Sequence, residues 1–189
     1  SASFVAQSFA TVRMSHEDAP CLSVIAKLLR SMYLHREIRE KGGAYGGFAI
    51  YSPEEGTFSF GSYRDPNIER TLDVYRNACD FITSDVVTDK DVKEAILQIC
   101  SEIDKPETPG PASIKAFYRD RVGLTDETRK KFKAALLAVN KDQVATTARK
   151  YFKADDVNKA TAVISSREKL EAANKILATD NKALKLIKI

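Results

Sequence analysis

The sequence predicts an α+β fold in which an antiparallel sheet has helices packed on one face. Two short alternating runs around a turn predict a β-hairpin, and apolar residues spaced three and four apart predict amphipathic helices. The predicted order is strand, helix, two strands, two helices, further helices, and a C-terminal strand, helix and strand. Hairpin-linked strands pair antiparallel, so this order differs from a doubly wound parallel sheet. The 189 residues, 43% of them hydrophobic, suffice for a single domain with a substantial core.

The chain opens with a predicted strand and a long helix. Residues 4–13 alternate loosely and end in a polar loop. Asp18 is the predicted N-cap of the helix. We expect the helix to end near Glu40, because two glycines follow and glycine readily adopts the left-handed conformation that ends helices. Four residues form the apolar stripe of this helix: Leu22, Ile25, Leu29 and Met32.

A β-hairpin and two helices should follow. Residues 48–50 and 58–60 flank the four-residue turn 53–56. One helix is predicted over residues 68–82, and a capping box formed by Thr88 and Asp91 should open the next one. The apolar stripe of the first of these helices consists of Ile68, Leu72, Tyr75, Cys79 and Ile82.

Three prolines within residues 106–111 are the strongest break in the chain, and we expect residues 105–111 to form an exposed loop without helix. Helices are predicted at 112–121, at 126–139 with Thr125 as cap, and at 141–153. A strand at 160–164, a helix at 167–177 and a last strand at 183–189 should complete the fold. The strand at 160–164 needs the first sheet as its partner, so we expect one cooperative unit.

Charge and cysteine content exclude several functional classes. Residues 105–153 hold 12 Lys or Arg against 5 Asp or Glu, but these charges recur on polar helix faces without interleaved aromatic residues, so no nucleic-acid partner is expected. No apolar run approaches the roughly 18 residues of a membrane span. Three cysteines without a C-x-x-C pair indicate core thiols in a reducing compartment. The two histidines, His16 and His35, are too few for a metal cluster on this chain.

One segment carries a chemical signal. Four glycines within residues 42–47 surround Tyr45, and Arg39 stands six residues before it near the predicted helix end. A guanidinium and a phenol can both donate hydrogen bonds to an oxygen that carries negative charge. A purely structural explanation stays open, because the helix dipole favours arginine at a helix C-terminus and a Gly-Gly pair is an ordinary helix stop. The spacing of the glycines fits no phosphate-binding loop.

Two motifs resemble a known family. The run LHREIREKGGAYGGFAIYSPEEGTFSFGSYRDPNIERTLDVY, residues 34–75, is similar to the C-terminal region of the pitrilysin/insulinase family of zinc metallopeptidases, especially its presequence-protease branch. The family motif Arg-x-x-Gly-Gly-Ala-Tyr-Gly-Gly corresponds to residues 39–47, and Ser-Tyr-Arg-Asp-Pro-Asn corresponds to residues 62–67. The resemblance implies the LuxS/MPP-like fold of that family, with residues 1–189 as one C-terminal-type domain of a much longer multidomain protein.

The resemblance also implies roles for individual residues. Arg39 and Tyr45 would bind the scissile carbonyl and stabilise the oxyanion, and Gly42 and Gly43 would line the substrate site. Zinc would be held by an N-terminal half of the same enzyme, since neither His16-Glu17-Asp18 nor the run that begins at His35 matches H-x-x-E-H. The chain itself should bind no metal and should be inactive alone.

The implied substrates are short unstructured peptides such as cleaved presequences. The implied location is a bacterial cytoplasm or the matrix of a mitochondrion or plastid. The alternative is a non-catalytic relative whose domain serves assembly. A nucleic-acid-binding module, which rests only on the basic segment, is a third and weaker interpretation.

Overall fold

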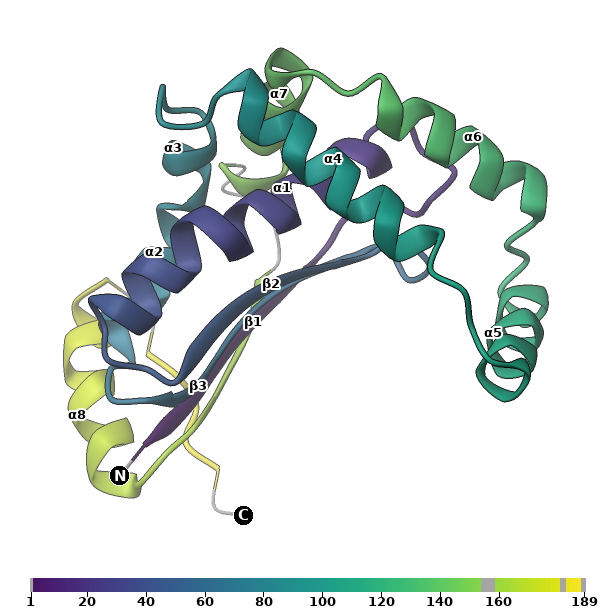
Figure 1. Ribbon diagram of the computed structural model, residues 1–189. Helices are drawn as coiled ribbons and strands as arrows, with labels where there is room; N and C mark the ends of the chain where they lie inside the picture. The colour runs from purple at the N-terminus through teal and green to yellow at the C-terminus, as the bar shows by residue number, and fades with distance from the viewer. Residues whose placement is uncertain (1, 154–158, 181–182, 188–189) are drawn as a thin grey trace.

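A four-stranded antiparallel sheet forms the base of the fold (Figure 1). The computed structural model describes residues 2–153, 159–180 and 183–187. The strands are β1 (Ser3–Ala10), β2 (Gly46–Ser52), β3 (Thr57–Asp65) and β4 (Lys159–Ile164), in the spatial order β2-β3-β1-β4. Every neighbouring pair is antiparallel. The predicted fold class is confirmed, and β2 and β4 are the edge strands.

The predicted hairpin and the long-range strand pairing are both present. Ser52 pairs with Thr57 across the turn, and Gly56 has a φ of +73°, which favours glycine. Phe4 pairs with Ile164 and Phe9 with Lys159, so the late strand β4 completes the sheet built by the first strand. Residues 105–108 are an exposed loop within this arrangement, as expected.

Helices cover one face of the sheet (Figure 1). Helix α1 (Ala19–Leu28) continues directly into η1 (Leu29–Glu40), and α2 (Glu69–Arg76), α3 (Ala78–Ile82), α4 (Asp89–Ile103) and α7 (Lys141–Phe152) complete the layer. The rings of Phe58 and Phe152 meet edge to face with centroids 4.8 Å apart, and Phe60 stacks on Tyr75 at 4.9 Å. These aromatic contacts between strands and helices form the centre of the core.

Three further helices follow in the predicted chain order, and a short 3-10 turn that was not predicted comes after the last of them. They are α5 (Pro109–Arg121), α6 (Asp126–Leu137), α8 (Arg167–Leu177) and the turn η2 (Ala178–Asp180). Thr88 and Asp91 form the predicted capping box of α4, and the Thr125 hydroxyl accepts the Thr128 N–H at 3.2 Å to cap α6. These hydrogen bonds satisfy N–H groups that have no partner within the helix.

Two predicted helix boundaries are wrong. The single helix expected over residues 68–82 is broken at Asn77, whose ψ of 3° separates α2 from α3, although all five stripe residues are buried. Helix α5 begins at Pro109 instead of residue 112. Pro109 and Pro111 stand in its first turn, where the missing proline N–H would have no intrahelical partner, so proline there does not exclude helix.

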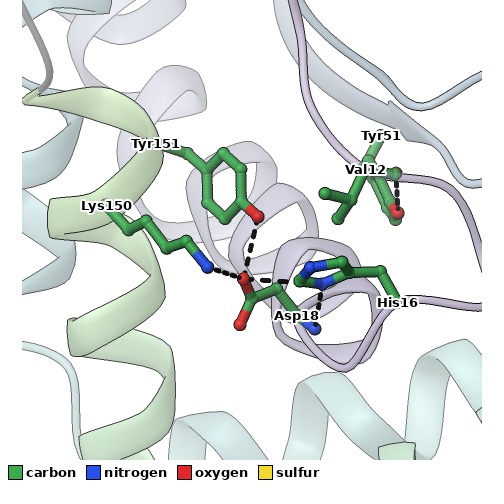
Figure 2. Close-up of polar contacts among 6 residues, drawn as sticks. All are labelled: Val12, His16, Asp18, Tyr51, Lys150 and Tyr151. Atoms are coloured by element: carbon green, nitrogen blue, oxygen red, sulfur yellow. Dashed lines mark hydrogen bonds and ion pairs between the residues drawn. The ribbon is translucent and has the colours of Figure 1, made fainter.

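Asp18 does not cap α1 with its side chain. Its backbone is already helical, and its carboxylate instead accepts hydrogen bonds from Lys150 Nζ at 2.6 Å and from the Tyr151 hydroxyl at 2.8 Å (Figure 2). Partial burial works to raise the pKa of Asp18, but these hydrogen bonds and the charges of Lys150 and His16 outweigh it and hold the pKa below its ordinary value. The Asp18 carboxylate therefore connects the start of α1 to α7 through two hydrogen bonds.

The last predicted strand is also wrong. Residues 183–187 form no strand, and residues 188–189 lie outside the described residues. The Asn174 amide explains this, because it accepts the Leu184 N–H and donates to the Leu184 carbonyl, each at 2.8 Å. The backbone polar groups of Leu184 are thus satisfied by a side chain instead of by a neighbouring strand.

Candidate functional site

Arg39 and Tyr45 line the same hollow, which lies where η1 ends and β2 begins. The hollow has a volume of about 460 Å³. Tyr45 is 59% exposed and Arg39 is also exposed. The Tyr45 hydroxyl makes no hydrogen bond to any described residue. A donor from η1 and a donor from the residue just before β2 therefore line the same hollow.

Arg39 lies in the last turn of η1, which is a π-helix over all of its 12 residues. Its hydrogen bonds span five residues, as in the bond from the Lys41 N–H to the Arg36 carbonyl at 3.0 Å. In this geometry both the fourth and the fifth following residue adjoin a given side chain. His35 accordingly lies 3.4 Å from Arg39 Nη1 through Nε2 and 3.3 Å from Glu40 through Nδ1. His35 thus contacts both the guanidinium of Arg39 and the carboxylate of Glu40.

The glycine pair after η1 turns the chain toward β2. Gly43 has a φ of +76°, and its N–H donates to the Arg39 carbonyl at 3.0 Å. A Cβ at Gly42 would lie 2.4 Å from the Ile38 carbonyl oxygen, so only glycine fits there. Neither glycine is among the residues that line the hollow, whereas Gly46 and Gly47 are.

The second motif, residues 62–67, forms hydrogen bonds with the first motif, residues 39–47. The Tyr45 N–H donates to the Arg64 carbonyl at 3.4 Å, and Asn67 Nδ2 donates to the Gly42 carbonyl at 2.7 Å. Asp65 is fully buried and accepts hydrogen bonds from the Asn67 N–H at 2.9 Å and from the Thr71 hydroxyl at 2.7 Å. These contacts hold the two motifs together in space, although more than ten residues separate them along the chain.

The ring of Tyr45 is held from two sides. Its centroid lies 5.2 Å from that of Tyr63 and 5.6 Å from Arg64 Cζ. Tyr63 rests on Gly46, its cross-strand partner, where a Cβ would come within 2.6 Å of Tyr63 Cε1. Arg64 has a φ of +49°, a conformation that costs free energy in a residue with a side chain. The surrounding contacts hold Arg64 in this conformation beside Tyr45.

The arrangement suits recognition of an oxygen that gains negative charge. The exposed guanidinium and phenol supply donors without a competing carboxylate among the lining residues of the hollow. Over the described ranges 2–153, 159–180 and 183–187, no group of three or more His, Cys, Asp or Glu side chains could hold a metal ion. The donor set therefore fits a carbonyl or oxyanion better than a cation.

Three residues that contact Arg39 or Tyr45 are not predicted from the sequence. His35 matters there only because it fails to match the zinc motif, although its position four residues before Arg39 indicates a contact on one helix face. Tyr63 and Arg64 belong to the quoted second motif, but their contact with Tyr45 depends on the β2–β3 register. That register could not be read from motif spacing alone.

Comparisons with known proteins identify the family of the chain. A family model described as the PreP C-terminal domain matches residues 3–167. A mitochondrial presequence protease of Xenopus tropicalis is 36% identical over 161 residues, which is 85% of this chain and 15% of the relative. A mitochondrial presequence protease of Yarrowia lipolytica is 43% identical over 140 residues, 74% of this chain and 14% of the relative. The chain thus spans about 15% of the length of these relatives.

Solved structures share the fold at low sequence identity. A protease from Helicobacter pylori has a TM-score of 0.69 and 18% identity, over 87% of this chain and 41% of that one. Pitrilysin has a TM-score of 0.63 and 15% identity, over 87% of this chain and 18% of that one. An inactive domain of peptidase M16 from Pseudomonas fluorescens has a TM-score of 0.65 and 15% identity, over 85% of this chain and 40% of that one.

The described residues include no helix that is both long and apolar enough to cross a membrane. The family match over residues 3–167 and the identity to presequence proteases settle the resemblance seen in the two motifs. The chain belongs to the PreP C-terminal domain family and has the α+β fold shared with pitrilysin.

Proposed function

We propose that this chain is the C-terminal half-site domain of a zinc metalloendopeptidase that degrades short unstructured peptides similar to presequences. The observation that supports this most is the pairing of Arg39 and Tyr45 in one hollow with their donors exposed. The zinc would be held by an N-terminal half of the same enzyme, where it would supply an activated water. This chain would contribute no zinc ligand.

The role of this domain is to stabilise charge on the scissile carbonyl. The Tyr45 hydroxyl donates a hydrogen bond to the carbonyl oxygen, and the Arg39 guanidinium adds donors and a positive charge. Both interactions strengthen as the oxygen becomes an oxyanion, so they favour the transition state over the bound substrate. Tyr63 and Arg64 keep the phenol ring in place during this change.

Gly42 and Gly43 serve the substrate site by shaping the turn before Tyr45. The Gly43 N–H and the Gly42 carbonyl already have partners within the chain. Their lack of side chains lets the backbone pass close to η1 and brings Tyr45 out beside the end of that helix.

The matrix of an organelle is the proposed location, since the relatives are mitochondrial proteins by name. Cys21, Cys79 and Cys100 are free thiols, which is compatible with a reducing compartment. The expected partners are the zinc-binding half of the enzyme and unstructured peptide substrates.

Kinetics of the complete enzyme test the proposal. Tyr45→Phe should lower kcat more than it raises KM, by about 10²–10³-fold, the usual cost of one oxyanion donor. Arg39→Ala should cost at least as much, and Arg39→Lys should restore only part of the activity because a point charge cannot reproduce the planar guanidinium. Tyr118→Phe on α5 is a matched control, because this tyrosine is 43% exposed and lies outside the hollow.

Thermal melting separates catalysis from folding. Both site variants should keep a melting temperature close to that of the wild type, since their side chains are exposed. A wild-type kcat for Tyr45→Phe at saturating peptide would remove the proposed role.

The alternative is a structural domain without a catalytic role. It is favoured by one comparison, the inactive M16 peptidase domain with the same fold. In that case both site variants would leave peptide hydrolysis by the complete polypeptide unchanged, and loss of assembly would be the sensitive readout.

A further inference from the structure

A second hollow is bordered by helices α4, α5 and α6 and by the turn of the β2–β3 hairpin. Its volume is about 270 Å³, and none of its lining residues also lines the hollow of Arg39 and Tyr45. This volume lies just below the range of about 300–1,000 Å³ for sites that hold drug-sized ligands, so a smaller ligand fits it. We call it the α5 hollow, and the lining residues that matter here are Glu54, Ile99, Ile103, Lys115, Arg119 and Phe132.

The Arg119 guanidinium on α5 lacks a partner. Its Nε is buried and has no hydrogen-bond acceptor among the described residues. The pKa of Glu107 is lowered mainly by its hydrogen bond with Lys115, at 2.6 Å, and to a smaller extent by the charge of Arg119, which does not form an ion pair with it. A buried donor without an acceptor destabilises the fold. The guanidinium of Arg119 therefore suits a ligand that supplies an anionic oxygen.

An unpaired carboxylate lines the same hollow. Glu54, in the hairpin turn, is half-buried, and its carboxylate forms no hydrogen bond or ion pair with any described residue. Glu102 also lines the hollow but is paired with Lys27. Arg129 likewise is paired with Asp126. Among the described residues that line the α5 hollow, one cation and one anion thus remain without an ion pair.

One wall of the α5 hollow is apolar. Ile99 and Phe132 are buried, Ile103 is half-buried, and all three line the space. They belong to α4 and α6, whereas the two unpaired charges come from α5 and the hairpin turn. An apolar ligand group that packs on this wall leaves water, which favours binding.

We propose that the α5 hollow binds a small zwitterion with an apolar side chain, the chemistry shared by aliphatic amino acids and short apolar peptides. The ligand carboxylate accepts hydrogen bonds from Arg119, the ligand ammonium group donates to Glu54, and the side chain packs on the apolar wall. A simple anion would leave Glu54 without a partner, and a simple cation would leave Arg119 without one. This site lies outside the candidate active site and does not depend on the proposed function.

Isothermal titration calorimetry of the complete enzyme tests the proposal. Leucine and leucyl-leucine are the probes, and at least one of them should bind. The N-acetyl form of each probe lacks the ammonium group, and the C-terminal amide form lacks the carboxylate. Each modified form should bind at least about tenfold more weakly, as expected for loss of a hydrogen bond to a charged group. Tighter binding of leucyl-leucine identifies peptide fragments as the ligand, and tighter binding of leucine identifies free amino acids.

Variants assign each charge of the ligand to a residue. Arg119→Gln should weaken binding of the unmodified probe by at least about tenfold and leave the affinity for the amide form unchanged, because that form has no carboxylate. Glu54→Gln should have the same effect on the unmodified probe and none on the N-acetyl form. The matched controls are Arg121→Gln on α5 and Glu55→Gln in the turn, which replace exposed residues outside the hollow. Tyr45→Phe should bind the probes as the wild type does.

Four results would overturn the proposal. They are equal affinity for the N-acetyl form and the unmodified probe, unchanged affinity in Arg119→Gln, loss of binding in Tyr45→Phe, and no binding of either probe at millimolar concentration. The first would indicate a site for simple anions, and the third would place the probe in the candidate active site. The modified probes test the wild type, so the outcome does not depend on whether a variant folds.

Discussion

Replacement of Gly46 by alanine should disturb Tyr45 while leaving the sheet intact. The new Cβ would lie 2.6 Å from Tyr63 Cε1, whereas ordinary contacts begin at 3.4 Å, so the Tyr63 ring has to move by about 0.8 Å. Tyr63 is 38% exposed and can shift outward. Its ring is 5.2 Å from that of Tyr45, so the displacement reaches the phenol.

A misplacement of about 1 Å at a catalytic group can cost on the order of 10²-fold in rate. We therefore expect Gly46→Ala to lower kcat by about 10- to 100-fold with a smaller change in KM. The free energy of unfolding should fall by only about 1 kcal/mol, because an exposed ring relieves most of the overlap.

Steady-state peptide cleavage by the complete enzyme and urea unfolding of the 189-residue chain measure the two quantities. Gly110→Ala is the matched control, since no atom lies within 4 Å of its built Cβ, and it should leave kcat unchanged. In a Tyr63→Ala background Gly46→Ala should have no additional effect on kcat, because the ring that transmits the shift is gone. A wild-type kcat for Gly46→Ala beside an impaired Tyr45→Phe would refute the role of Tyr63 in positioning Tyr45.

Three other expectations concern stability and reactivity. Asp18→Asn should lower the melting temperature at neutral pH. Folding lowers the pKa of Asp18, so the stabilisation that its charged carboxylate provides is complete above pH 3.8 and is lost as the pH falls through the folded pKa. The melting temperatures of the two proteins should therefore converge in acid. Gly42→Ala should reduce the free energy of unfolding by about 2–3 kcal/mol in urea titrations, because its Cβ would clash with a backbone carbonyl of η1. Burial raises the pKa of Cys21 and Cys79, so iodoacetamide should label half-buried Cys100 first, and equal labelling rates in the native chain would contradict this.

Elements with a strong local signal were predictable. The hairpin around residues 53–56 and the capping box at Thr88 depend on interactions between residues close in sequence, so their patterns are visible in the chain itself. The break at Asn77 was not predictable from the apolar stripe, because the same five side chains are buried whether the helix is continuous or bent. Burial patterns constrain which faces are apolar, and a single backbone dihedral angle can change without altering them.

The carboxylate of Asp18 shows how tertiary contacts override a local preference. A capping role is reasonable for an aspartate before a helix, but Lys150 and Tyr151 approach it from α7, more than 130 residues later (Figure 2). Two charge-assisted hydrogen bonds from α7 stabilise the Asp18 carboxylate more than one local capping hydrogen bond would. No residue near Asp18 in the sequence indicates these contacts.

The site divides in the same way. The glycine-rich run was enough to single out Arg39 and Tyr45, because a helix stop next to a phenol and a guanidinium is a local pattern. The contacts that hold Tyr45, the contact of His35 with Arg39 and the hollow that Arg39 and Tyr45 share depend on strand register and helix placement. These arise from packing between segments that are distant along the chain, and only the folded structure brings them together.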